Sequence, residues 1–290
     1  MASLKPRNDE MKRGLIMEKL IITAAICGAE VTKEHNPAVP YTIEEIAREA
    51  ELAAKEGASI IHLHVREDDG TPTQSKARFE AAIKAIKERC PDVIIQPSTG
   101  GAVGMSNDER LQPIELYPEM ATLDCGTCNF GGDDIFVNTE NTIIEFGQRM
   151  IKLGIKPELE VFDKGMIDMA IRVAKKGYIL TPMHFDFVLG VNGGISASLR
   201  DLVFMAGSIP AGSTFTVAGI GRHQFEMAAG AILLGGHVRV GFEDNVNLSR
   251  GVKAKSNGEL VAKAVRIAKE LGREIATPNE AREILGLMKK

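Results

Sequence analysis

The sequence has few cysteines and no long apolar run, and each absence excludes a class of protein. Four cysteines in 290 residues are too few for a disulfide framework, so we interpret them as reduced thiols. No apolar stretch approaches the roughly 20 residues that span a bilayer, and the N-terminus lacks the apolar core of a secretory signal. We therefore expect a cytoplasmic protein.

The chain also lacks an excess of positive charge. Lys and Arg together number 35 against 39 Asp and Glu, which gives a net charge of -4 and a pI of about 5.9. A protein that neutralises nucleic-acid phosphates needs a basic surface, so a nucleic-acid partner is not expected.

What the sequence does contain fits one large globular domain. It is 44% apolar and 26% charged, which provides a substantial core. A (β/α)8 barrel typically takes about 250 residues. We assign residues 17–290 to a single barrel, and we expect the charged, weakly patterned residues 1–16 to form a mobile extension.

Short β-branched runs alternate with amphipathic stretches from residue 20 onward, as in repeated βα units around a parallel sheet. The predicted strands are 20–27, 58–65, 93–97, 120–123, 158–161, 179–183, 214–218 and 237–241. The clearest predicted helices are 42–56, 76–89, 138–153, 164–176, 222–234 and 257–271. Eight strands predict the fold class as an α/β (β/α)8 TIM barrel.

The competing fold is an open doubly wound sheet, which normally carries a glycine-rich phosphate-binding turn after its first strand. Here the corresponding residues are Cys27-Gly28-Ala29-Glu30, without a G-x-G-x-x-G pattern. The barrel is therefore favoured.

Two histidines alternate along the second predicted strand. His62 and His64 share one strand face, while the apolar residues between and beside them share the other. Two imidazoles at this spacing near a barrel mouth are well placed to bind Zn2+. The alternative is a hydrogen-bonded pair in the barrel core.

A third ligand is available from the last strand. Alternation there places Arg239, Gly241 and Glu243 on one face, so that Glu243 is directed toward the barrel axis. Two histidines and a glutamate form a known catalytic zinc set. The alternative is that Glu243 and Arg239 form a buried salt bridge that only fills the barrel.

Other polar residues follow or end strands, on the rim where barrel enzymes hold their active sites. Glu30 follows the first strand, Ser98 the third, and Thr122 lies in the fourth. Each alone fits an ordinary cap, turn or loop residue. The pair Cys125 and Cys128 forms a C-x-x-C without the partner residues of a zinc or redox motif, so we interpret these as ordinary cysteines.

Together these segments resemble the β-keto acid cleavage enzymes. The resemblance rests on HLHVREDDG at 62–70, STGGAVG at 98–104, PEMATL at 118–123, AGIGR at 218–222 and GFEDN at 241–245. It begins at Met17 and excludes only the N-terminal extension. The first and last of these motifs are far more specific in combination than either is alone.

The resemblance implies a role for each candidate residue. His62, His64 and Glu243 would hold Zn2+, and Asp244 with Arg239 would abstract a proton. Ser98 and Thr122 would contact the carboxylate and oxygen atoms of the substrate, and Glu30 would pair with a substrate amino group. C-x-x-C thiols are not part of this pattern.

The resemblance also implies the reaction. Zinc would polarise a ketone and ease enolate formation, and the enolate would attack acetyl-CoA. Transfer of CoA and a retro-Claisen step would release acetoacetate and a new acyl-CoA. With Glu30 as the amine partner, the expected substrate is 3-keto-5-aminohexanoate and the product 3-aminobutyryl-CoA, a step of lysine fermentation, performed by a homotetramer.

Three alternatives remain. The same chemistry could act on a different β-keto acid. A zinc amidohydrolase also uses an H-x-H in a barrel, but on the first strand and with later histidines, for which only His184 is available here. A non-catalytic ligand-binding barrel would have no need of a base such as Asp244.

Overall fold

The computed structural model describes residues 18–288, and the predicted extension 1–16 lies outside this range. Eight strands form one sheet in which all neighbours are parallel, in the order β5-β2-β1-β12-β11-β10-β9-β6. The strands are β1 (Ile22–Ala25), β2 (Ile60–Leu63), β5 (Ile94–Pro97), β6 (Met120–Asp124), β9 (Lys156–Val161), β10 (His184–Leu189), β11 (Thr214–Gly219) and β12 (His237–Val240).

The two outer strands of this order, β5 and β6, pack against each other and complete the barrel. Just beyond β5, the Thr99 N–H donates to Thr122 Oγ1 at 3.1 Å, and the Thr99 hydroxyl donates to the Thr122 carbonyl at 2.7 Å. These bonds join the strands where no strand ladder does. The predicted (β/α)8 TIM barrel is therefore confirmed.

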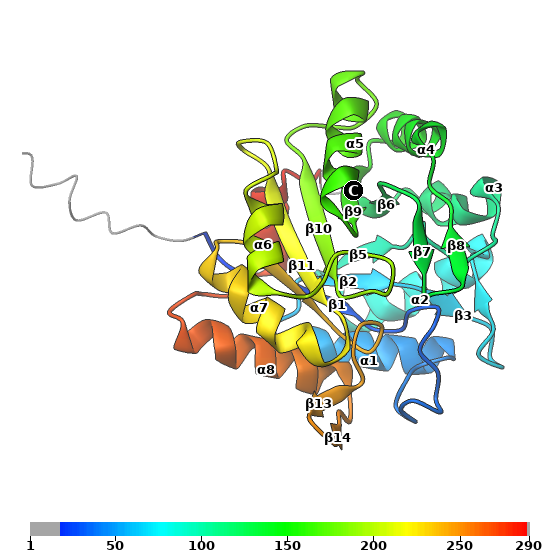
Figure 1. Ribbon diagram of the computed structural model, residues 1–290. Helices are drawn as coiled ribbons and strands as arrows, with labels where there is room; N and C mark the ends of the chain where they lie inside the picture. The colour runs from blue at the N-terminus through cyan, green and yellow to red at the C-terminus, as the bar shows by residue number, and fades with distance from the viewer. Residues whose placement is uncertain (1–17, 289–290) are drawn as a thin grey trace, which may run out of the picture.

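Helices surround the strands, as Figure 1 shows. They are α1 (Ile43–Glu56), α2 (Lys76–Arg89), α3 (Asn107–Arg110), α4 (Glu140–Leu153), α5 (Lys164–Lys175), α6 (Leu199–Ala206), α7 (Gln224–Leu233), α8 (Asn257–Glu270) and α9 (Pro278–Leu285). Among residues 18–288, no helix combines the length and the hydropathy that a membrane-spanning segment requires. All six predicted helices are present, whereas α3, α6 and α9 were not predicted.

Short elements lie in the connections between the barrel strands and the helices. Three two-stranded hairpins form from β3 (Val65–Arg66) with β4 (Pro72–Thr73), β7 (Cys128–Phe130) with β8 (Asp134–Phe136), and β13 (Asn247–Ser249) with β14 (Val252–Lys253). Two 3-10 turns, η1 (Gln112–Leu116) and η2 (Gly221–His223), lie after α3 and β11.

The prediction of the sixth strand was wrong. It was placed at 179–183, but the strand is β10, which pairs with β9 and β11 over residues 184–189. Pro182 interrupts the predicted segment and has no N–H to donate to a ladder. The true strand directs Phe185 and Phe187 into the apolar core while His184 and Asp186, both buried, face the other way.

The amino-terminal end of the barrel is closed by a separate apolar cluster. Side chains from the starts of the strands meet α9 there, and the cluster comprises Ile21, Ile60, Ile94, Met120, Ala276, Ala281 and Leu285. α9 is held in place by Arg282, which donates to both carboxylate oxygens of Glu119 at 2.6 and 2.8 Å. The amino-terminal end of the barrel interior is therefore apolar, whereas the interior toward the carboxyl ends of the strands is polar.

Because Leu285 is buried in this cluster, Leu285→Ala should lower the free energy of unfolding by about 2–5 kcal/mol. Turnover at low temperature should be unchanged, since the cluster lies at the opposite end from the strand termini that carry the site. Urea unfolding followed by circular dichroism measures the effect, with the exposed Glu283→Ala on the same helix as control. Equal stability of the two variants would contradict a stabilising role for the apolar cluster under α9.

Candidate active site

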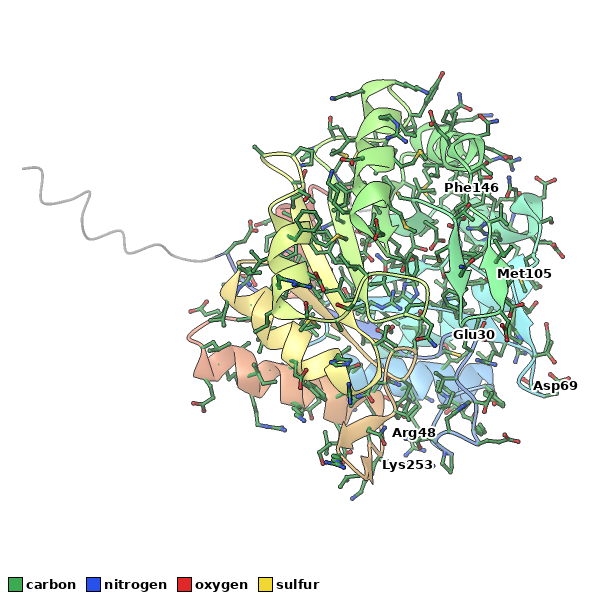
Figure 2. The ribbon with its side chains drawn as sticks, viewed as in Figure 1. Glu30, Arg48, Asp69, Met105, Phe146 and Lys253 are labelled. Atoms are coloured by element: carbon green, nitrogen blue, oxygen red, sulfur yellow. The ribbon has the colours of Figure 1, made fainter. Side chains whose placement is uncertain are left out.

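A cavity of about 670 Å3 lies at the carboxyl ends of the barrel strands. Every strand or the loop after it contributes to its wall, through Glu30, His64, Ser98, Asp124, Glu160, Val188, Ile220 and Arg239. In Figure 2 the labelled Glu30 lies below the β7–β8 hairpin in this view, and both line the cavity. This is where (β/α)8 enzymes carry out their chemistry.

Three predicted metal ligands converge at the floor of this cavity. His62 Nε2 lies 3.4 Å from Glu243 Oε2, and His64 Nε2 lies 3.7 Å from Glu243 Oε1. One ligand atom from each of the three residues falls within 4.8 Å of the others. His62 Nε2 and Glu243 Oε2 are buried and have no hydrogen-bond partner, an arrangement that fits a bound cation.

Glu243 reaches the other ligands from a turn rather than by the expected strand alternation. β12 ends at Val240, and the turn that follows is closed by the Asp244 and Asn245 N–H groups, which donate to the Gly241 carbonyl at 3.1 and 2.9 Å. Glu243 then packs against Gly28 of the first loop, where an added Cβ would lie 2.7 Å from Glu243 Cγ. Gly28 also has φ +71°, so glycine suits both the turn and the close approach.

Both histidines have a ring nitrogen that could bind a metal, because of a hydrogen bond to His62 and the burial of His64. His62 Nδ1 lies 2.9 Å from Gln96 Oε1; this contact assigns the proton to Nδ1 and leaves Nε2 free. Burial lowers the pKa of His64 to about 4, so its ring is neutral at pH 7, the form that binds metals.

Glu243 supplies the negative charge among the three candidate metal ligands. Burial alone would raise its pKa, but Arg239 and the two histidines lower it by more, so the pKa lies well below its usual value. Arg239 Nη2 also forms an ion pair with Glu243 Oε1. The predicted alternative of a buried salt bridge therefore does exist, but it occupies only one of the two carboxylate oxygens.

Arg239 holds Asp244 in a fixed orientation. Its Nε and Nη2 donate to the two oxygens of Asp244, each at 2.9 Å. Burial raises the pKa of Asp244, and Arg239 offsets only part of that rise. A carboxylate with a raised pKa that lines a cavity has the properties of a general base.

The sequence analysis missed two buried carboxyl groups of the cavity, Asp124 and Glu160. Glu160 accepts from Arg239 Nη1 at 2.8 Å, and Asp124 lies 3.3 Å from Arg110 Nη2. Burial raises the pKa of both, and the charge of Asp124 raises that of Glu160 further. Their positions two residues beyond Thr122 and Glu158 in predicted strands were the available signal.

The predicted substrate contacts differ in their access to the cavity. Ser98 lines it, and its Oγ accepts from the Gly100 N–H at 3.1 Å. Glu30 also lines it but is exposed to solvent. Thr122 is fully buried, bonded to Thr99, and is not among the lining residues.

One side of the cavity is apolar. Phe130 and Phe136 of the β7–β8 hairpin lie edge to face at a centroid distance of 5.9 Å, and Phe162 packs on Phe130 at 6.4 Å. All three line the cavity with Val188 and Ile220. The site therefore offers a charged floor and an apolar wall.

The remaining candidates lie elsewhere. His184 begins β10 at the amino-terminal end of the barrel, where it contacts Glu158 Oε2 at 2.8 Å, so it cannot serve an amidohydrolase-like site at the mouth. Cys125 and Cys128 are unpaired and buried, and burial raises the pKa of Cys128 to about 11. Such thiols are poor nucleophiles.

Comparison with known proteins agrees with this arrangement. The chain is 77% identical to the 3-keto-5-aminohexanoate cleavage enzyme of Fusobacterium nucleatum over 94% of this chain and 100% of that protein. It is 38% identical to the 3-oxoadipate:acetyl-CoA acetyltransferase of Cupriavidus necator, over 92% and 94% of the two chains.

A solved structure shares the fold. The binary complex of ObcA with oxaloacetate superposes with a TM-score of 0.75 at 22% identity, covering 87% of this chain and 68% of that chain. The model of the β-keto acid cleavage enzyme family matches residues 19–287. The chain therefore belongs to the β-keto acid cleavage enzyme family.

Proposed function

We propose that this protein cleaves 3-keto-5-aminohexanoate with acetyl-CoA in a zinc-dependent reaction that yields acetoacetate and 3-aminobutyryl-CoA. The observation that carries the proposal is the conjunction, in one cavity, of three convergent metal-ligand side chains with the oriented carboxylate Asp244. The 77% identity to a protein of that name supports the choice of substrate.

His62, His64 and Glu243 would hold the metal, because their donor set fits Zn2+ and two of their buried atoms lack other partners. Zinc bound there would supply Lewis acidity toward the substrate ketone. Asp244 would take a proton from the carbon between the ketone and the carboxylate. Arg239 would keep Asp244 in one orientation through its two hydrogen bonds.

The reaction then balances without another reactant. The carbanion carbon bonds to the acetyl carbonyl of acetyl-CoA, and CoA thiolate leaves and attacks the original ketone carbon. The bond between that ketone carbon and the former carbanion carbon then breaks. This releases acetoacetate as a carbanion, which takes the proton back from Asp244. The remaining acyl group leaves as its CoA thioester.

Ser98 would bind the substrate carboxylate with its hydroxyl, since it lines the cavity and is nearly buried. Thr122 would act from beneath the cavity, by holding Thr99 and the loop after β5 in place through its two bonds. Glu30 would pair with the substrate ammonium at the mouth. Lysine fermentation is the process that such a substrate implies.

The expected homotetramer and cytoplasmic location stay predictions. Self-association would cover the exposed apolar side chains of α6, which are Leu199, Val203 and Phe204 at 53–59% exposure.

We predict one tightly bound zinc per chain. The double variant His62→Ala/His64→Ala should lose this metal. Gln96→Leu should retain the ligands but weaken zinc affinity by about 10- to 100-fold, because the His62 ring loses its orienting partner. Competition with a chromogenic chelator measures the affinity directly. Gln74→Leu, a buried glutamine that bonds none of the three ligands, is the control.

Asp244→Asn should keep its zinc but lose at least about 100-fold in kcat, because the amide preserves the shape and cannot accept the proton. Metal content and turnover are measured on the same preparation. A variant with full metal and an unchanged rate would exclude Asp244 as the base.

Glu30→Gln should lower kcat/KM for 3-keto-5-aminohexanoate by about tenfold, since an exposed carboxylate gives a modest charged hydrogen bond. Neutral β-keto acids of similar length should be unaffected. Acetoacetate formation from both substrates, with both proteins, is the assay. An equal loss of kcat/KM on the two substrates would refute Glu30 as the amine partner. If the unchanged protein were active only on other keto acids, 3-keto-5-aminohexanoate would be refuted as the substrate.

A further inference from the structure

Three cations at the mouth of the barrel have no carboxylate partner. Arg222 lies in η2 after β11, while Arg250 and Lys253 lie at the tip and second strand of the β13–β14 hairpin after β12. All three are exposed, and within residues 18–288 none of them forms an ion pair. We call them the rim cations.

The acidic residues that flank the rim cations in the sequence have other partners: Glu259, for example, accepts from the Lys255 N–H at 2.8 Å. Residues 245–256 contain Arg250, Lys253 and Lys255 but no carboxylate. Residues 219–225 contain Arg222 and no carboxylate. The nearest acid in the following helix, Glu226, lies 3.2 Å from His223 Nδ1. Arg222 Nε donates to His223 Nε2 at 3.1 Å, and no carboxylate pairs with the rim cations in the described residues, so they remain available to an external anion.

Hydrogen bonds tie the loops that carry the rim cations to each other and to the loop after β1. The Gly221 N–H donates to the Asp244 carbonyl at 2.7 Å and joins the two loops. β13 packs against η2, and Asn36 Nδ2 donates to the carbonyls of Val246 and Ala254 at either end of the hairpin, at 3.2 and 2.8 Å. Figure 2 shows Lys253 on this hairpin, at the edge of the molecule.

Residues that line the cavity lie close in the chain to one of these cations, Arg222. Asp244 and Ile220 line the cavity, and Arg222 follows Ile220 by two residues. Val191 lines the same cavity. A flexible chain whose end lies beside Asp244 would therefore pass over apolar surface before it reaches the rim cations.

The other part of the mouth has the opposite charge. Glu30 and Asp134 line the cavity there, and the exposed Glu34 and Asp133 are their neighbours. Lys33 in the same loop is already paired with Glu45 at 2.5 Å. A ligand with several negative charges is thus repelled from that side and attracted to the rim cations.

We propose that Arg222, Arg250 and Lys253 bind the phosphate groups of acetyl-CoA, with the pantetheine arm lying over Ile220 and Val191. The inference rests on the proposed function, which supplies a co-substrate with phosphates at one end and a thioester at the other. The rim cations follow the seventh and eighth barrel strands, the loops that frequently bind phosphate in this fold. Arginine and lysine are the usual partners of phosphate oxygens.

The test is the triple variant Arg222→Gln/Arg250→Gln/Lys253→Gln, compared with the unchanged protein on two acyl donors. KM for acetyl-CoA should rise about tenfold or more, while kcat and KM for the keto acid should stay within about twofold. With S-acetylpantetheine, which lacks the phosphates, the two proteins should behave alike. Lys84→Gln/Lys152→Gln/Lys175→Gln removes the same charge from exposed positions on α2, α4 and α5 and should match the unchanged protein.

Three results would overturn the site: an unchanged KM for acetyl-CoA, an equal rise with S-acetylpantetheine, or an equal rise in the control triple variant. Calorimetric titration with CoA alone separates this inference from the proposed function. If the unchanged protein binds CoA and the triple variant binds at least about tenfold more weakly, the site stands even if turnover is absent. Equal CoA affinity refutes it, whatever the turnover.

Discussion

The guanidinium of Arg239, buried inside the barrel, is the interaction on which the site depends. It contacts four carboxylates, those of Glu160, Asp186, Glu243 and Asp244. Removing a partner from such a buried cluster costs several kcal/mol, because an uncompensated charge would remain out of water. One cation cannot balance four anions, however. Burial raises the pKa of Glu160 and Asp186 well above the usual range, while Glu243 stays ionised through Arg239 and the histidines. Arg239 thereby keeps Glu243, the candidate metal ligand, charged and fixes Asp244 beside it.

This polar interior requires the barrel to obtain its stability elsewhere. The outward faces of the strands pack on the amphipathic helices, and a separate apolar cluster under α9 closes the amino-terminal end. Between them, the His184 ring contacts Thr214 Oγ1 and Glu158 Oε2, each at 2.8 Å. Chemistry and packing are therefore separated along the barrel axis. Changes at the closed end should alter stability first, and changes at the mouth should alter reactivity first.

Short β-branched runs between amphipathic stretches were enough to predict seven of the eight barrel strands, and alternation within the second strand was enough to predict the inward direction of His62 and His64, because both are local properties of the chain. The sixth strand was missed because its inward residues His184 and Asp186 are polar, which conceals a buried strand from a hydrophobicity pattern. Glu243 was identified for a partly wrong reason, since a turn rather than strand alternation directs it. Gln96, Asp124 and Glu160 act through contacts with residues of other elements, and Thr122 is bonded to Thr99 in the loop after β5. Such contacts have no local signature.

The mouth of the barrel combines both signs of charge, and this matters for a reaction that must bring two substrates together. An ammonium-bearing keto acid is attracted to the side of Glu30 and Asp134, while a phosphate-bearing thioester is attracted to the side of Arg222 and the β13–β14 hairpin. Because the two charged ends approach from different parts of the rim, neither has to leave before the other enters. Their reacting carbon atoms would then meet beside Asp244, where the apolar wall of Phe130, Phe136 and Phe162 limits access of water. Exclusion of water favours transfer of the acyl group to CoA over its hydrolysis.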